Sequence, residues 1–328
     1  MSSSQVEYNP TLDFWRREVE DNPDDPYTLA VAAYHLYSDQ QSRPALRLLD
    51  RCLTIAPEYI KAKILKGAIH LSRGEYEVGW PLFDMKNVWH QYGGKQWDGT
   101  PTEERLLIWD NEGFGDYIMN MRFLPRVKEL APNVEVAAKE GLADLTRDSF
   151  PDIKIVPYYN EAVLHCPITS LPAVFKITLD TIPNKVPFIA TNAHKYTNKK
   201  IGLSWSTDHT IGERFFVKSI PTELMMPLLE RDDTISLHKE DLDVDTFAET
   251  ASLVKCLDLV VTGDTVIAHL SGALGIPTWV LLSHDCDWRW MTKRLDSPWY
   301  PTVRLFRQER LNDWQPLLDQ VMMELDNG

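Results

Sequence analysis

Cysteine is scarce in this sequence: there are four among 328 residues, at Cys52, Cys166, Cys256 and Cys286. They are widely separated and form no Cys-x-x-Cys pair, which argues against a disulfide framework and a zinc knuckle. We therefore expect reduced thiols, most of them buried.

Positive charge is also in short supply. Lys and Arg total 34 against 48 Asp and Glu, so the formal net charge is −14. Binding to nucleic acid or to an anionic membrane surface needs concentrated positive charge, so this balance argues against both as a general mode of binding. A local basic groove remains compatible with it.

Long apolar runs are absent as well. No stretch reaches the roughly 18 apolar residues of a membrane span, and residues 1–10 lack the basic and apolar regions of a secretory signal. We therefore expect a cytoplasmic protein with no membrane span. The composition, 44% hydrophobic and 25% charged, is typical of a globular protein, and the length suits about two domains.

The N-terminal third shows a repeat. Pro23 and Pro57 are 34 residues apart, which is the tetratricopeptide period, and small residues recur at the same spacing, with Gly67 in register with Ala33. The pattern predicts a short all-α tetratricopeptide-repeat segment over residues 1–100. Two interpretations stay open: a docking surface for a peptide, an acceptor or a second subunit, and a scaffold that binds nothing.

After a polar loop at 92–104, apolar runs of strand length alternate with helical stretches, which is typical of parallel sheets covered by helices. A linker at 183–200 separates two halves, 101–190 and 191–328, and a ligand cleft is expected between their strand carboxyl ends. The predicted strands are 106–109, 134–138, 153–156, 201–205, 234–237, 259–262 and 278–282, and the predicted helices are 117–130, 222–230, 245–256, 265–274 and 313–325.

The clearest motif runs over 259–282, LVVTGDTVIAHLSGALGIPTWVLL, and reads as strand, turn, helix and strand. Thr265 and His269 are four apart and share one helix face, separate from an aliphatic stripe. The start of this helix offers N–H groups and a positive dipole end that suit a diphosphate. Asp264 is interpreted as a donor contact or as the helix N-cap, and His269 as a donor contact or a core histidine.

This motif resembles the donor-site signature of heptosyltransferases and of tetratricopeptide-linked, O-GlcNAc-transferase-like glycosyltransferases of bacterial or phage type. The resemblance covers roughly residues 25–315. It implies an α/β GT-B fold, with two Rossmann-like domains facing a cleft: an acceptor domain at 101–190 and a donor domain at 191–328. The matching residues are Asp264-Thr265, His269, Gly272-Ala273-Leu274-Gly275 and Pro277, with His165-Cys166-Pro167, Ser170-Leu171-Pro172, Ile201-Gly202-Leu203-Ser204-Trp205, Asp287-Trp288-Arg289-Trp290 and Ser297-Pro298-Trp299-Tyr300-Pro301.

The same resemblance implies a catalytic base. Asp116 ends the run Asn111-Glu112-Gly113-Phe114-Gly115-Asp116, in which Gly113 and Gly115 would allow a tight turn and close approach to phosphate. As the base, Asp116 would deprotonate the acceptor hydroxyl. An equally ordinary role for it is that of helix N-cap.

Arg214 and Lys218 follow the strand that ends at Trp205, at the carboxyl edge of the sheet. Positive groups there would balance the charge of the departing nucleotide diphosphate without a metal, and the resemblance implies this role for Lys218. His238, at the end of its strand, would meet the nucleoside. The full set of expected donor contacts is Trp205, Ser206, Arg214, Lys218, His238, Asp264, Thr265 and His269.

Two clusters have competing interpretations. The run 284–287, His-Asp-Cys-Asp, invites a metal interpretation, but it lies in a single loop without the spacing of a metal site, and we expect no metal there. The aromatic residues Trp288, Trp290, Trp299 and Tyr300 form either a sugar-stacking wall or part of the core.

These observations predict a glycosyltransferase that moves a sugar from a nucleoside diphosphate sugar, UDP-linked, to an acceptor hydroxyl, with inversion and with no cofactor or metal. The alternative is a non-catalytic module that binds a nucleotide sugar or glycan while the repeats dock partners or self-associate. The acceptor is left open among a protein, a glycan and a modified base in phage DNA. Loss of transfer in both His269→Ala and Lys218→Ala is expected for the enzyme.

Overall fold

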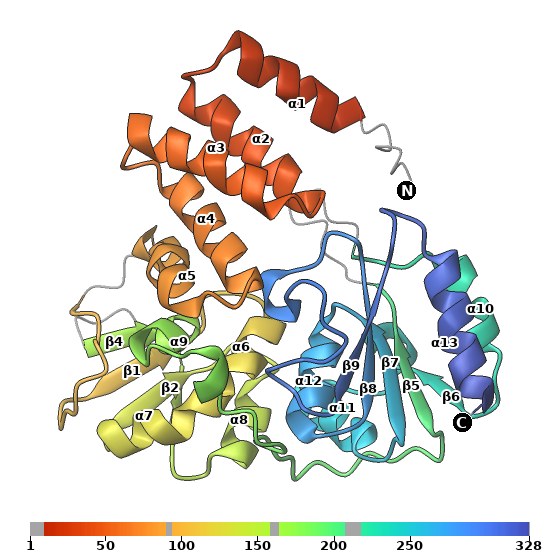
Figure 1. Ribbon diagram of the computed structural model, residues 1–328. Coiled ribbons are helices and arrows are strands. Elements are labelled where there is room, and N and C mark those ends of the chain that lie inside the picture. Colours follow the sequence, from red (N-terminus) through yellow and green to blue (C-terminus); the bar gives the residue numbers. More distant parts are fainter. Residues whose placement is uncertain (1–9, 90–93, 158–163, 207–217, 328) are drawn as a thin grey trace. The chain divides into compact units, whose positions relative to one another are not determined.

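The computed structural model describes residues 10–89, 94–157, 164–206 and 218–327. The chain forms two compact units, with the division between Lys86 and Asn87 (Figure 1). Within the described ranges, no helix is both long enough and apolar enough to cross a membrane.

The first unit is all-α. Its helices form successive neighbouring pairs around a core that contains Leu29, Ala33, Leu49 and Ile69. The carboxylate of Asp25 caps the second helix by accepting from the Thr28 N–H at 2.8 Å. The helices are α1 (Pro10–Asp21), α2 (Pro26–Ser38), α3 (Ser42–Ile55), α4 (Ile60–Ser72) and α5 (Tyr76–Phe83).

Small residues allow α4 and α5 to approach closely. A Cβ atom added to Gly67 would lie 2.5 Å from the backbone nitrogen of Phe83 and 2.9 Å from the carbonyl oxygen of Gly79. The all-α segment is therefore present, and Gly67 lies where the backbones of two helices meet. Its assignment to the tetratricopeptide class stays a prediction.

The first sheet of the second unit has four parallel strands in the order β3-β2-β1-β4. The strands are β1 (Leu106–Trp109), β2 (Val134–Ala137), β3 (Lys154–Val156) and β4 (Leu164–Pro167), and the helices are α6 (Phe114–Asn120), α7 (Leu124–Leu130), α8 (Ala143–Ser149) and α9 (Leu171–Val174).

One helix was predicted at 117–130, and this was wrong. The segment is α6, then a 3₁₀ turn at Met121–Phe123, then α7. Pro125 has no N–H to donate, and it lies in the first turn of α7, where a donor is not needed.

The second sheet has five parallel strands in the order β6-β5-β7-β8-β9. The predicted strands and helices of this half are present to within two residues, and β9 is an addition to them. The strands are β5 (Ile201–Ser204), β6 (Thr234–Ser236), β7 (Leu259–Gly263), β8 (Thr278–Leu282) and β9 (Val303–Arg307), and the helices are α10 (Thr222–Leu229), α11 (Phe247–Val254), α12 (Val266–Leu274) and α13 (Gln315–Asn327).

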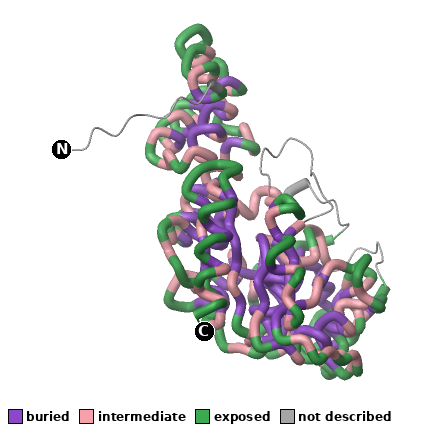
Figure 2. The backbone as a smooth tube through the Cα atoms, turned by 90° about the vertical axis from the view of Figure 1, so that its right-hand side faces the viewer, coloured by how far each residue is buried: buried purple, intermediate pink, exposed green. Residues whose placement is uncertain are grey.

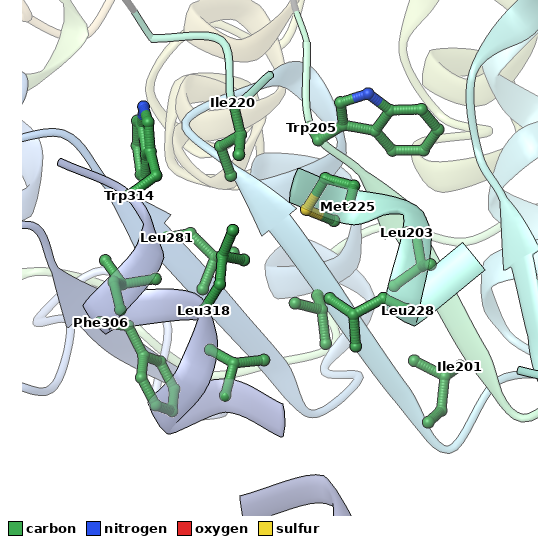
Figure 3. Packing of buried hydrophobic residues seen from close by; sticks show 13 residues of the cluster. Ile201, Leu203, Trp205, Ile220, Met225, Leu228, Leu281, Phe306, Trp314 and Leu318 are labelled. Atoms are coloured by element: carbon green, nitrogen blue, oxygen red, sulfur yellow. The ribbon is translucent and has the colours of Figure 1, made fainter. Parts of the chain in front are cut away.

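The last helix, α13, packs against α10 and the second sheet. Figure 3 shows strand residues such as Leu203 and Leu281 facing Met225 of α10 and Leu318 of α13, and all four are buried. Each such side chain stabilises the fold by roughly 1.5–3 kcal/mol relative to an exposed one. Buried residues are concentrated in the interior of this unit (Figure 2).

The expected α/β class with two parallel sheets is thus confirmed, and its assignment to the GT-B type stays a prediction. In the second sheet the chain leaves β5 toward β6 on one side, whereas β7 lies on the other side. The loops after β5 and β7 therefore diverge and leave a crevice at the carboxyl edge. The assignment of the two halves to acceptor and donor stays a prediction.

Candidate functional site

A cavity of about 770 Å³ lies between the two sheets of the second unit. Its walls are the segments that follow β1 and β2 on one side and β5, β6, β7 and β8 on the other. Because the carboxyl ends of parallel strands share one sheet edge, these distant segments converge there. The wall of the first half contains Phe114, Gly115, Asp116, Lys139, Glu140 and Gly141, and the opposite wall includes Ser204, Ser206, Lys218, His238, Asp264, Thr265, His269, Asp287 and Arg289.

Two helices begin at this cavity. Thr246 and Phe247 at the start of α11, and Val266 and Ile267 at the start of α12, are among its lining residues. The N-terminal end of a helix carries a partial positive charge, so both helices favour an anion in the cavity.

Asp264 and Lys218 form an ion pair in the wall, with 2.5 Å between the carboxylate Oδ2 and Nζ. Burial alone would raise the pKa of Asp264, but the Lys218 ammonium, which also donates a hydrogen bond to it, and the Arg289 guanidinium together hold this pKa below its usual value. Burial lowers the pKa of Lys218, yet the carboxylates of Asp264 and Asp287 raise it by more. Lys218 is therefore a charged ammonium facing the cavity.

The N-cap of α12 is Thr265, so the interpretation of Asp264 as the cap is wrong. The Thr265 hydroxyl accepts from the Ile267 N–H at 3.2 Å and lies 3.0 Å from the Thr262 hydroxyl. A neighbouring threonine takes the capping role because its backbone is extended, with φ −118° and ψ 175°. The Thr265 hydroxyl is thus engaged in capping α12, and its contact with a ligand stays a prediction.

Arg289 is a cavity cation that the motif analysis missed. Its Nη2 donates to Asp116 at 2.7 Å and its Nε donates to Asp287 at 2.9 Å. Burial alone would lower the pKa of Arg289, but three carboxylates, led by that of Asp116, raise it well above the ordinary value. The run 287–290, Asp-Trp-Arg-Trp, is part of the resemblance, which gives Arg289 no role of its own.

Asp116 lies in the first turn of α6, and the N-cap is Gly113, so Asp116 is not the cap. Its carboxylate faces the cavity from the first half and is partly exposed, with 23% of its side chain accessible. Asp116 therefore stands opposite the segments that hold Lys218 and Asp264. This position suits the expected base, whose catalytic role stays a prediction.

His269 is almost completely enclosed, with 2% of its surface exposed. Its Nδ1 lies 2.9 Å from the Tyr300 hydroxyl and its Nε2 lies 3.3 Å from Nη1 of Arg289. Burial, aided by the Arg289 charge, lowers the pKa of His269 to about 3, so the ring is neutral at physiological pH. Both ring nitrogens thus have partners inside the protein, and its expected contact with a donor stays a prediction.

Gly115 is small because His269 packs against it. A Cβ atom at this position would lie 2.6 Å from Cδ2 of His269. The expected reason, a tight turn, does not apply, because Gly115 is inside α6 and Gly113 has an ordinary φ of −71°. Phosphate contact by either glycine remains a prediction.

Three of the expected donor contacts lie after β5 and β6, among them His238, the expected nucleoside contact. The Trp205 backbone N–H donates to Nε2 of His238 at 3.2 Å, and their rings stack with centroids 4.1 Å apart. Ser206 and His238 line the cavity, whereas the indole of Trp205 packs in the core (Figure 3). Arg214 lies outside the described residues.

The apolar part of the cavity is formed by Leu242, Val244 and two aromatic rings, Phe114 and Phe247, whose centroids are 4.9 Å apart. One cavity thus combines cations and helix N-termini with an apolar section. A ligand with an anionic group joined to a flat apolar group would match both parts.

The aromatic residues after the second sheet belong to the core. Trp288, Trp290, Trp299 and Tyr300 are each at most 6% exposed, and the rings of Trp288 and Trp299 form a T-shaped pair with centroids 6.2 Å apart. The sugar-stacking interpretation is therefore wrong for this cluster.

The 284–287 loop bonds to neighbouring protein groups. Arg307 donates to the Cys286 sulfur at 3.2 Å, and Asp287 accepts from Arg289. Across the described ranges, no group of His, Cys, Asp and Glu side chains is arranged to hold a metal ion. The four cysteines of the chain are free thiols, with Cys52 and Cys166 buried.

No family model matches the chain. A curated relative is protein FlbA of Caulobacter vibrioides, which is 23% identical over 325 residues, covering 79% of this chain and 54% of FlbA. The chain therefore spans about half the length of the curated relative that it matches.

Several solved structures are distantly similar. A glycosyl transferase family 9 protein from Veillonella parvula has 11% identity and a TM-score of 0.48, covering 69% of this chain and 98% of that one. The E. coli protein TibC, described as a bacterial iron-containing dodecameric glycosyltransferase, has 11% identity and a TM-score of 0.47, with coverages of 70% and 77%. An O-GlcNAc transferase mutant from Thermobaculum terrenum has 8% identity and a TM-score of 0.32, with coverages of 84% and 72%. These values are too low to assign a function.

Proposed function

We propose that this protein transfers a sugar from a nucleoside diphosphate sugar to an acceptor hydroxyl. The observation that carries the proposal is the cavity itself. It places the cation Lys218 and the start of α12 on one wall and the carboxylate of Asp116 on the other. Displacement at a sugar carbon requires positive charge that stabilises the anionic leaving group on one side and a base for the attacking hydroxyl on the other.

The donor would bind along the wall of the second half. Its diphosphate would lie near Lys218 and the N-terminal end of α12, where positive charge favours it. Its nucleoside would extend past His238 to the apolar section at Leu242 and Val244. The diphosphate and Asp264 would then share the Lys218 ammonium.

Asp116 would take the proton from the acceptor hydroxyl as the oxygen bonds to the anomeric carbon. The bond from that carbon to the donor phosphate oxygen breaks at the same time, and the electron pair leaves with the nucleoside diphosphate. Lys218 stabilises the charge that develops on it. Attack and departure on opposite sides of the carbon invert its configuration.

The finer features are proposals of the same kind. They are UDP as the nucleotide, transfer without a metal or other cofactor, a cytoplasmic location, and tetratricopeptide-type docking or self-association by the first unit. The acceptor is one of three classes: a protein, a glycan or a modified DNA base.

Calorimetric titration with UDP and ADP, paired with an assay of nucleotide release from UDP- and ADP-sugars, tests the proposal. We expect Lys218→Met to lose nucleotide affinity and Asp116→Asn to keep affinity but lose transfer. Lys185→Met, which removes an exposed lysine, is the matched control and should leave both unchanged. Failure of the wild-type protein to bind any nucleotide would refute the proposal, and binding without turnover across a broad acceptor panel would favour a binding module.

A further inference from the structure

A line of hydrogen bonds joins the core of the second half to Asp116. It runs from the Tyr300 hydroxyl to Nδ1 of His269 at 2.9 Å, from Nε2 of His269 to Nη1 of Arg289 at 3.3 Å, and from Nη2 of Arg289 to Asp116 at 2.7 Å. Tyr300 is fully buried. The last bond crosses from the second half to the first.

The direction of these bonds follows from the chemistry of the groups. A guanidinium only donates, so Nε2 of His269 must accept from Arg289 and carries no proton. In a neutral imidazole the proton is then on Nδ1, which donates to the Tyr300 oxygen. The contacts on both sides of the ring therefore select a single tautomer.

The ring has little freedom to leave this orientation. Trp290 stacks on it with centroids 5.4 Å apart and planes 28° from parallel, and Gly115 packs so closely against Cδ2 of the ring that an added Cβ atom there would lie 2.6 Å from it. Tyr300 is held in turn by Arg122, whose guanidinium lies 4.7 Å from the tyrosine ring centroid. Arg122 also donates to the Trp299 carbonyl at 2.6 Å.

We infer that His269 is a positioning residue, which acts through Arg289 to fix the carboxylate of Asp116 and does not itself hold the donor. This inference rests on the proposed function and deepens it, because it specifies how the base is oriented. Asp287 accepts from Nε of the same guanidinium at 2.9 Å. Two contacts, Nε to Asp287 and Nη1 to His269, therefore hold the guanidinium while Nη2 binds Asp116. Loss of the His269 contact leaves only the one to Asp287.

Two variants of His269 separate its nitrogens. Glutamine can place a polar atom near the position of Nε2 and so keep a partner for Nη1 of Arg289. Asparagine can replace only Nδ1, so Nη1 loses its partner. We expect transfer by His269→Asn to fall by about 100-fold in kcat, as for a small misplacement of a catalytic group. His269→Gln should stay within about tenfold of the wild type. The UDP dissociation constant should change little in either.

A role in donor binding would give a different result. Both variants would then weaken UDP binding, and asparagine would be no worse than glutamine in kcat; either finding would overturn the inference. Tyr300→Phe keeps the ring and removes the acceptor for Nδ1–H, so a fall in kcat with unchanged UDP affinity is expected there too.

The tautomer provides a test that does not need turnover. Long-range ¹⁵N–¹H spectra of the histidine rings, with the His269 signals identified by their loss in His269→Gln, should show a protonated Nδ1 and an unprotonated Nε2 from pH 5 to 8. A proton on Nε2 would refute the inference even if no donor were found. Absence of turnover with the expected tautomer would instead count against the proposed function alone.

Discussion

Arg289 and Asp116 are 173 residues apart in the sequence, and their side chains meet at 2.7 Å across the cavity. The guanidinium comes from the segment after β8 and the carboxylate from the first turn of α6. This ion pair therefore connects the two α/β halves at the place where the proposed donor and acceptor would meet. It fixes the orientation of Asp116 and bridges the two walls at once.

Replacing Arg289 should affect both stability and transfer. Arg289→Met leaves Asp116 and Asp287 without their shared cation, and removal of one partner from a buried ion pair costs about 3–5 kcal/mol of unfolding free energy. Arg289→Lys should not rescue transfer, because an ammonium cannot make the contacts of Nε, Nη1 and Nη2 together. Urea unfolding and nucleotide release measure the two effects.

The matched control for this change is Arg294→Met in the same loop. Arg294 is partly exposed and pairs with Asp296, itself 66% exposed. Its loss should change the unfolding free energy by less than about 1 kcal/mol. Equal destabilisation by the two variants would contradict the role given to Arg289.

The pair Lys218–Asp264 predicts a separation of stability from binding. Lys218→Met alone leaves the buried Asp264 carboxylate unpaired and should destabilise the fold, whereas Lys218→Met with Asp264→Leu replaces the pair with apolar groups and should restore most of the loss. Neither protein regains the cation, so UDP affinity should stay at least about tenfold weaker in both. Recovery of UDP affinity in the double variant would contradict the proposed role of Lys218.

Gly115→Ala should destabilise the protein, because the added methyl group would collide with the His269 ring. The added Cβ would lie 2.6 Å from the His269 ring, and overpacking of this kind costs about 1–3 kcal/mol. In Gly113→Ala the nearest contact would be 3.3 Å, to the Asp116 carboxylate, and φ is an ordinary −71°. Thermal unfolding of both variants should therefore show the larger loss for Gly115→Ala, and an equal or larger loss for Gly113→Ala would contradict this.

Much of the second half could be predicted because its signals are local. The run 259–282 contains a strand, a helix, a Gly at the helix end and a second strand, and Gly275 has the left-handed φ of 78° that its place as C-cap favours. The spacing of Thr265 and His269 predicted a shared helix face; Thr265 is instead the N-cap that precedes α12, although both residues line the cavity. The spacing could not give the partners of His269, because Tyr300 and Arg289 come from later segments.

The parts that were missed depend on contacts between distant segments. Strand β4 is short and contains His165 and Pro167, so it lacks a strand-like composition, and its pairing with β1 is what makes it a strand. The importance of Arg289 likewise follows from Asp116, which no spacing rule connects to it. Fold class was therefore easier to predict than the electrostatics of the site.

In the first unit, Gly67→Ala should weaken the contact between α4 and α5. The new methyl group would lie 2.5 Å from the backbone nitrogen of Phe83, and a backbone atom cannot move aside as a flexible side chain can. A loss of about 1–3 kcal/mol is expected from overpacking. Lys61→Ala on the exposed face of the same helix is the control, and equal unfolding midpoints for the two variants would contradict the close approach.

Neutral His269 predicts how stability depends on pH. Its pKa is about 3 in the folded protein, against 6.5 for an ordinary histidine. Between these values the unfolded chain binds a proton at this ring and the folded chain does not, so the unfolding free energy falls as the pH falls. The slope from this one group is about 1.4 kcal/mol per pH unit, and it vanishes above pH 6.5 or so.

His269→Gln removes this titration while keeping a polar side chain at the site. The difference in unfolding free energy between the wild type and His269→Gln should be constant above about pH 7 and should shift in favour of the variant as the pH falls toward 4. His35 and His165, whose pKa values burial also lowers, are present in both proteins, so they cancel in the comparison. Parallel curves for the two proteins would mean that His269 takes up its proton at the same pH in the folded and unfolded states, which its burial and its bond from Arg289 do not allow.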